Sequence, residues 1–248
     1  MHGVLPQPRK PKQPAPTPKD AREILCRVLE EPDISKKLHQ ERSRLEKFKK
    51  FGNQDQQNAL AEPFRSGRFQ LRLSLSEFPT QEQLVQFDSR RKKQSWFKQW
   101  YSFIGGEWLE EWVAQQIRSL QLSPQLEVRV GVQTFRGEER TQLEIDVVVV
   151  RGYRSYFLSC TTSGEKSLCK SKLFEVATRA RQLGGDLARA ALVCLAKSDT
   201  ASALQKDIED MWGASNTPQV FGLEDVRCWS DCGDKQPNLS RLKEWLES

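Results

Sequence analysis

The alternation of apolar and polar positions is clearest from residue 96 to the end of the chain. Apolar residues recur at helical spacing in 105–120, where they form the predicted buried stripe Trp108, Leu109, Trp112, Val113, Ile117 and Leu120. Strand-like alternation or apolar runs follow in 126–135, 143–150 and 156–162. A helix is predicted over 169–183, a strand over 189–196, and further helices near 199–212 and 239–247. This order predicts an α/β fold with a mixed sheet flanked by helices, and not a doubly wound nucleotide-binding fold.

The N-terminal part has a different pattern. Residues 1–18 are rich in proline and basic residues and predict a disordered tail. Residues 20–31 predict a helix with Ile24, Leu25, Val28 and Leu29 on one stripe, and a charged helix is predicted over 35–51. One alternating stretch, 68–78, reads as a strand. We therefore predict a tail (1–18), a mostly helical accessory region (19–95) and a main domain (96–248).

Composition narrows the class of protein. Of 248 residues, 37% are hydrophobic and 29% charged, which is enough for one good-sized domain. No apolar run suggests a membrane span or a signal peptide, so a cytoplasmic protein is expected. A formal charge of +6 mildly favours nucleic acid or an acidic partner.

Histidine and cysteine usage excludes some chemistry. The chain has only two histidines, both in the N-terminal region, which argues against histidine-based catalysis. Cys160 and Cys194 lie in apolar strand-like runs typical of reduced, buried thiols. Cys228 and Cys232 have no second pair of zinc ligands near them, so zinc binding is not favoured.

Two carboxylates begin the strand over 143–150. Glu144 and Asp146 are two residues apart and share one face of the strand. Asp146 lies between Ile145 and Val147, where a carboxylate is costly unless it is hydrogen-bonded, paired or bound to a cation. A metal ligand and an acid paired with a neighbouring arginine are equally compatible with this pattern. In the preceding helix, Glu110 flanks the buried stripe and could reach the edge of the sheet.

These segments carry a resemblance. The run "GGEWLEEWV", then "EIDVVVV", a further strand and "KLFEVATRARQLGGDLARAALV" resembles the nuclease domain of CRISPR-associated, CARF-linked endonucleases over about residues 103–228. Those enzymes have the PD-(D/E)XK, restriction-endonuclease-like fold. The resemblance implies that Glu110 and Asp146 hold Mg²⁺ or Mn²⁺. Glu144, on the same strand face as Asp146, is a further ligand candidate. The resemblance also implies an acid and a lysine on the next strand.

The chain departs from this family at the next strand. Where the family pattern has Glu-Cys-Lys-Thr-Gly, the chain has Ser159, Cys160, Thr161, Thr162 and Ser163. A hydroxyl is a poor ligand for a hard divalent cation, and threonine supplies no positive charge. Lys166 and Lys172 are candidates to replace the missing lysine, and solvated or phosphate-contacting surface lysines are the alternative. Residues 1–95 lack a βαβ pattern and a glycine-rich phosphate loop, so sensing of cyclic oligoadenylate by this chain alone is not expected.

Three functions follow from these residues. The first is a metal-dependent nuclease of prokaryotic defence that cuts DNA or RNA, and the second is an inactive pseudonuclease that binds nucleic acid or acts as a scaffold. The third is a protein-binding adaptor that docks through the N-terminal helices. The residues predicted to contact nucleic acid are all basic and lie near Trp96 and Trp100 or in the helix after the third strand: Arg90, Arg91, Lys92, Lys93, Lys98 and Lys170. The sequence leaves the oligomeric state open, a homodimer included.

Overall fold

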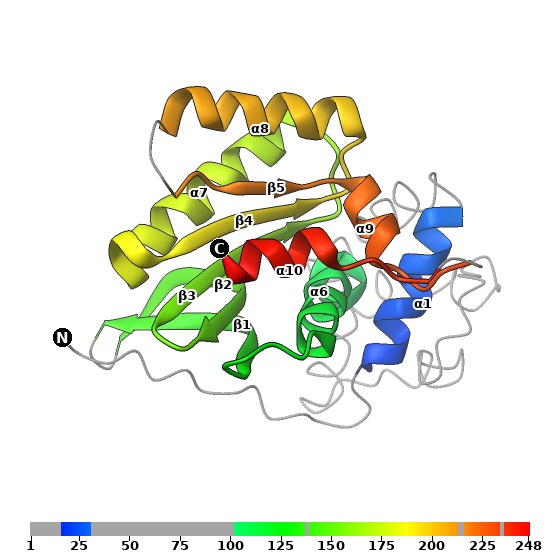
Figure 1. Ribbon diagram of the computed structural model, residues 1–248, viewed down its shortest axis with the longest axis horizontal. Coiled ribbons are helices and arrows are strands. Elements are labelled where there is room, and N and C mark those ends of the chain that lie inside the picture. Colours follow the sequence, from blue (N-terminus) through cyan, green and yellow to red (C-terminus); the bar gives the residue numbers. More distant parts are fainter. Residues whose placement is uncertain (1–15, 31–101, 137–138, 213–215, 234–235) are drawn as a thin grey trace, which may run out of the picture. The chain divides into compact units, whose positions relative to one another are not determined.

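The computed structural model describes residues 16–30, 102–136, 139–212, 216–233 and 236–248 (Figure 1). The chain divides into two compact units, one within residues 10–108 and one that includes residues 109–248. The predicted helix over 35–51, the predicted strand over 68–78 and the basic cluster at 90–98 lie outside the described residues.

The first unit contains helix α1 (Pro18–Glu30) and a π-helical turn, η1 (Phe103–Glu107). Thr17 and Asp20 cap α1: the Thr17 amide donates to Asp20 Oδ2 at 2.7 Å, and the Asp20 amide donates to Thr17 Oγ1 at 3.4 Å. Ile24, Leu25 and Val28 are buried, which confirms most of the predicted stripe. Pro18 is the first helical residue because its fixed φ suits that position, and this places the start slightly earlier than predicted.

The second unit is built on a five-stranded sheet with the order β1-β2-β3-β4-β5. The strands are β1 (Leu126–Arg136), β2 (Glu139–Arg151), β3 (Arg154–Thr161), β4 (Arg189–Cys194) and β5 (Gln219–Phe221). β1, β2 and β3 form an antiparallel meander, while β4 and β5 pair in parallel with the strand before them. The predicted α/β class with a mixed sheet is confirmed.

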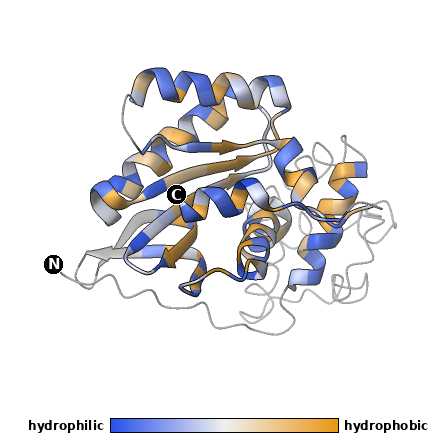
Figure 2. Cartoon of the chain, viewed as in Figure 1, coloured by the Kyte–Doolittle hydropathy of each residue, from blue (hydrophilic) through white to orange (hydrophobic). Residues whose placement is uncertain are grey.

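Among the described residues of this unit, five helices flank the sheet: α6 (Trp108–Ser119), α7 (Lys166–Gly184), α8 (Ser198–Trp212), α9 (Leu223–Trp229) and α10 (Ser240–Glu247). A short 3₁₀ turn, η2 (Gly185–Leu187), follows α7. Leu173 of α7 and Leu204 of α8 pack with Leu192 of β4 in one core cluster, so α7 and α8 cover one face. On the other face, the Tyr156 ring lies 5.2 Å from that of Trp245 in α10. Figure 2 shows the apolar strands between helices that carry many hydrophilic residues.

Alternation along the strands explains this two-sided core. Successive side chains point to opposite faces, so β2 directs Val147 and Val149 to one face and Asp146 and Val148 to the other. The predicted stripe of α6 is confirmed at five of its six positions, and the sixth, Leu120, is half-buried.

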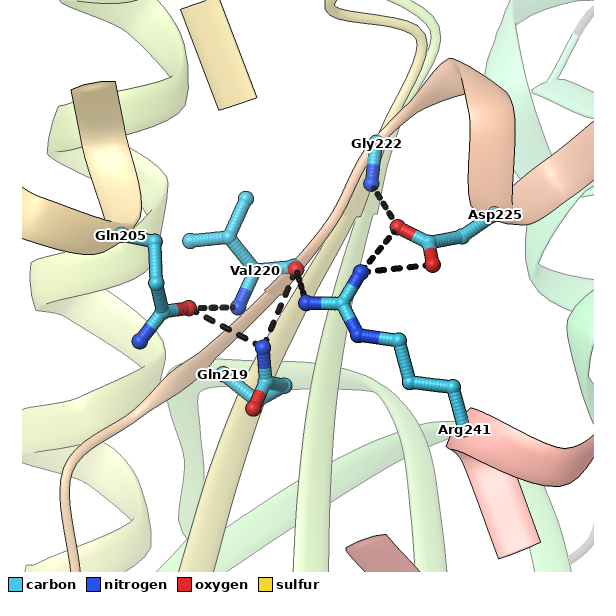
Figure 3. A network of polar contacts seen from close by, with 6 residues as sticks. All are labelled: Gln205, Gln219, Val220, Gly222, Asp225 and Arg241. Carbon is cyan, nitrogen blue, oxygen red and sulfur yellow. Dashed lines mark hydrogen bonds and ion pairs between the residues drawn. The ribbon is translucent and has the colours of Figure 1, made fainter. Parts of the chain in front are cut away.

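A polar network ties the short strand β5 to α8, α9 and α10 (Figure 3). Gln205 Oε1 accepts the Val220 amide at 2.7 Å, and Arg241 donates to the Val220 carbonyl at 3.1 Å. Arg241 also meets both oxygens of Asp225 at 2.6 Å, while Asp225 accepts the Gly222 amide at 2.8 Å at the start of α9. The network satisfies backbone groups of an edge strand that has only one strand neighbour.

The cysteines follow the sequence prediction in part. Cys160 and Cys194 are buried free thiols, as predicted. Cys232 is disulfide-bonded, unlike the two strand cysteines, and Cys228 is free and exposed.

Candidate functional site

The candidate site lies where β2 and β3 part. Their register runs as far as the pair Val147 and Leu158, and the next residue back along β2 is Asp146. Asp146 Oδ2 accepts the Ser159 hydroxyl at 2.9 Å and the Cys160 amide at 2.7 Å. The carboxylate thus binds a backbone N–H of β3 at the point where the ladder of β2 and β3 ends. Because both donors meet Oδ2, Oδ1 is the oxygen of Asp146 that these two hydrogen bonds leave open to a ligand.

Burial dominates the electrostatics of Asp146. It raises the pKa of the carboxyl above the ordinary value of 3.8. The Cys160 amide, the Lys172 charge and the Ser159 hydroxyl lower the pKa, while Glu144 raises it further. The net direction is upward, so the ionised carboxylate is less stable here than in water. A cation beside Asp146 would remove part of this cost.

Lys172 is the lysine whose positive charge lowers the pKa of Asp146. It lies in the second turn of α7, is half-buried, and precedes the buried Leu173. Its charge acts on both Asp146 and Cys160. Of the two lysines predicted to replace the missing one, Lys172 is therefore the one whose charge acts on Asp146.

Glu110 and Glu144 contribute further negative charge. Glu110 of α6 is half-buried, and its charge helps to raise the pKa of the Cys160 thiol. Glu144 is exposed on β2, and its backbone carbonyl accepts Arg179 Nη1 at 2.6 Å. Because burial, Asp146 and Glu110 all hold the Cys160 pKa well above 9.0, this thiol stays protonated near neutral pH and is no nucleophile.

The residues at the expected acid and lysine positions are both uncharged and take part in hydrogen bonds within the chain. Ser159 donates to Asp146, whereas Thr161 Oγ1 accepts the Ser163 amide at 3.2 Å. Ser163 Oγ in turn accepts the Glu165 amide at 3.1 Å. These side chain-to-backbone bonds are typical of turns, and here they shape the loop that leads into α7. They add no charge to the site.

The remaining predicted residues lie elsewhere or outside the described part. Lys166 and Lys170 each place Nζ 3.2 Å from Asp207 Oδ2 in α8. Arg90, Arg91, Lys92, Lys93 and Lys98 fall outside the described residues, so their contact with nucleic acid stays a prediction.

The metal site stays a prediction, which rests on the chemistry of the residues present. Among the residues that the structure describes, no group of three or more histidine, cysteine, aspartate or glutamate side chains is placed to hold a metal ion. Mg²⁺ usually needs fewer protein ligands, because it retains several waters and takes one or two carboxylates plus substrate phosphate oxygens. Asp146 and Glu110 are hard oxygen ligands of this kind, so the residues present fit Mg²⁺ or Mn²⁺ better than zinc.

A family model for the Card1-like endonuclease domain matches residues 98–230, which is more than half of the chain. The chain belongs to this family. The resemblance found in the sequence is thereby confirmed, and the Card1-like domain coincides with the sheet, α6 to α9 and the Asp146 site. No curated protein matches the chain.

Solved structures are similar to this chain at low identity, and the first described here shares its fold. Protein VC1899 from Vibrio cholerae is 17% identical, with a TM-score of 0.52 over 99% of this chain and 59% of that chain. Can2 from Sulfobacillus thermosulfidooxidans, in complex with cyclic tetra-adenylate, is 16% identical, with a TM-score of 0.46 over 94% of this chain and 56% of that one. A type III CRISPR defence DNA nuclease activated by cyclic oligoadenylate is also 16% identical, with a TM-score of 0.39 over 76% and 25% of the two chains. The chain with the Card1-like domain spans about three-fifths of VC1899.

Two aspects of the site were not predicted from the sequence: the choice of Lys172 over Lys166, and the role of the Cys160 amide. Helical spacing could have separated Lys172 from Lys166, since Lys172 lies about 120° around the helix from Lys166. The role of the Cys160 amide has no signal in the side-chain pattern.

In the described parts of the chain, no helix has the length and apolar character needed to cross a membrane.

Proposed function

We propose that the Card1-like domain is a metal-dependent nuclease of CRISPR-associated defence with a rearranged active site. Its reaction would be hydrolysis of a phosphodiester in DNA or RNA. The observation that supports the proposal is the Asp146 carboxylate at the place where β2 and β3 part, held by two hydrogen bonds to Oδ2. Lys172 is the lysine whose charge acts on this carboxylate.

Asp146 and Glu110 would hold Mg²⁺ or Mn²⁺, with Glu144 at the exposed rim. The ion, when bound, would polarise a phosphoryl oxygen and lower the pKa of a bound water. Ser159 and the Cys160 amide fix the Asp146 carboxylate through Oδ2. This leaves Oδ1 for coordination without a change of rotamer.

Lys172 would take the part of the missing strand lysine. The charge of its ammonium group acts on the Asp146 carboxylate. The same charge would stabilise the negative charge that develops on the phosphoryl oxygens. The residue at the usual position, Thr161, is engaged with the Ser163 amide and carries no charge.

A metal titration followed by binding heat tests the ion site without a guess at the substrate. We expect heat with Mn²⁺ for the unchanged chain and none for Asp146→Ala. Cleavage of single- and double-stranded DNA and RNA in Mn²⁺ should disappear in Asp146→Ala and fall about 10²–10³-fold in Lys172→Met. Lys206→Met, on exposed α8 surface, is the matched control and should cut normally. No cleavage of any substrate by the unchanged chain would overturn the proposal.

A second function has its own observation. Ser159 and Thr161 replace both charged groups of the family pattern, and both hydroxyls are engaged in hydrogen bonds within the chain. This favours a pseudonuclease that binds nucleic acid without cutting it. Salt-sensitive retention of nucleic acid that survives Asp146→Ala, together with no binding heat for Mn²⁺, would identify this function.

A further inference from the structure

The first two turns of α7 carry a pair of lysines that share one carboxylate. Lys166 and Lys170 are four residues apart and lie on the same side of the helix. Each Nζ lies 3.2 Å from the same atom, Asp207 Oδ2 of α8. The three side chains are partly exposed, at 49%, 40% and 33%. Water and mobile anions therefore reach this cluster.

The charges in this cluster do not balance. Two ammonium groups face one carboxylate, so one positive charge remains. Both lysines hold the pKa of Asp207 below its ordinary value of 3.8, which keeps the carboxylate ionised. Helix α7 as a whole has five basic residues (Lys166, Lys170, Lys172, Arg179 and Arg181) and one acidic residue, Glu175.

These lysines are also at the wrong end of the helix for its own stability. The N-terminal end of a helix carries partial positive charge and favours anions over cations. Lys166 is the first residue of α7 and Lys170 lies one turn later. The helix dipole and both ammonium groups therefore attract an anion to the same place, and Asp207 supplies a carboxylate there.

The cluster adjoins the candidate site through a single helix. Cys169 Sγ donates to the Ser163 carbonyl at 3.4 Å, which fixes the start of α7 to the loop after β3. At about 100° per residue, Lys172 lies about 160° away from Lys170 around the helix axis. The same two turns thus present Lys172 to Asp146 and the lysine pair to α8.

We propose that Lys166 and Lys170 form a binding site for a backbone phosphate of the nucleic acid, and that Asp207 occupies this site as an internal phosphate mimic. The bound phosphate would displace Asp207 from the lysines. The inference rests on the proposed function only for the identity of the ligand, a nucleic acid. It needs neither a metal ion nor cleavage.

Binding is measured by fluorescence anisotropy in EDTA, with labelled 30-nucleotide DNA, the same RNA and the DNA duplex, over a series of salt concentrations. Lys166→Ala with Lys170→Ala should weaken binding about tenfold at low salt and reduce the slope of log K against log salt by about 1–2. The double substitution Lys197→Ala with Lys206→Ala removes two exposed lysines outside the cluster and is the matched control. It should change the slope less.

Asp207→Asn tests the mimic directly. It should tighten binding several-fold more than Asp210→Asn, which removes an equal charge from an exposed position of the same helix. Equal effects of Asp207→Asn and Asp210→Asn, equal effects of the two lysine pairs, or no retention of any of the three probes would each overturn the inference. Thermal melts confirm that each variant is folded. Because EDTA prevents metal-dependent cleavage, binding can succeed where the proposed nuclease activity fails.

Discussion

Asp146 lowers the stability of the folded chain when it is ionised, and it is also the central residue of the candidate site. Burial raises the pKa of its carboxyl, so ionisation near neutral pH opposes folding, although Ser159 and the Cys160 amide hold the carboxylate in place. A carboxyl with a raised pKa in the folded state makes the chain less stable as pH rises from 3.8 through that raised pKa. Residues that cost stability in this way are typical of functional sites.

Asp146→Asn should therefore stabilise the chain at neutral pH. The amide oxygen of asparagine can accept both hydrogen bonds without a charge, so the penalty of ionisation disappears. The gain over the unchanged chain should be full above the raised pKa and should vanish near pH 3.8 and below. In a domain of this size each kcal/mol gained would raise Tm by about 2–4 °C. Thermal melts of both chains from pH 3 to pH 8 measure the difference.

A stability difference that stays constant over this range would contradict the assigned direction of the pKa shift. Glu111→Gln serves as the control, since Glu111 pairs with Arg118 at the surface of α6 at 3.3 Å. A surface pair of this kind is worth about 0–1 kcal/mol, so its removal should leave the pH profile nearly unchanged.

The sequence predicts Asp146 as a site residue, but it does not predict which groups surround its carboxylate. A carboxylate among four valines and an isoleucine is visible as an energetic conflict in one dimension. The partner that relieves it, the Cys160 amide, is a backbone group and depends on where β2 and β3 separate. Helical spacing separates Lys172 from Lys166, but which of the two faces Asp146 depends on how α7 lies on the sheet.

At the scale of elements, β5 is a strand that hydrophobic periodicity does not predict. The apolar run 219–226 contains a three-residue strand and the start of α9, and neither is long enough for a periodic signal. The long elements α6, α7 and α8 were predictable because their apolar stripes extend over three turns or more. The short ones are held by the side-chain network of Figure 3, which connects residues far apart in the sequence.

Arg241→Ala should destabilise the domain by about 1–3 kcal/mol. It removes a two-bond contact with Asp225, which is only 15% exposed, and a donor to the Val220 carbonyl. The guanidinium also lies 5.2 Å from the centre of the Phe221 ring. Arg241→Lys keeps the charge and loses the planar fork, so it should recover only part of the loss. Urea unfolding measures both.

Arg227→Ala is the matched control for this network. Arg227 lies in α9 and pairs with the exposed Glu224 at 2.7 Å, so its loss should cost less than about 1 kcal/mol. An Arg241→Ala variant no less stable than Arg227→Ala would show that the network does not hold β5.

At the scale of the molecule, the sheet and its five helices have a core of their own. Trp112 of α6 stacks on Trp229 of α9 at 6.4 Å, and Phe221 of β5 lies 5.0 Å from Trp229. The chain shortened to residues 96–248, the predicted main domain, should therefore fold by itself. It should give a single cooperative urea transition and a near-ultraviolet circular dichroism signal from these packed rings.

A chain shortened further, to residues 120–248, is the informative comparison. It lacks α6, whose Leu109, Trp112, Val113 and Ile117 are all essentially inaccessible to solvent. Without them one side of the core opens, and helical far-ultraviolet signal without near-ultraviolet signal is the expected result. If 96–248 behaves in the same way as 120–248, the predicted boundary at residue 96 is wrong. The main domain would then need residues before 96 to complete its core.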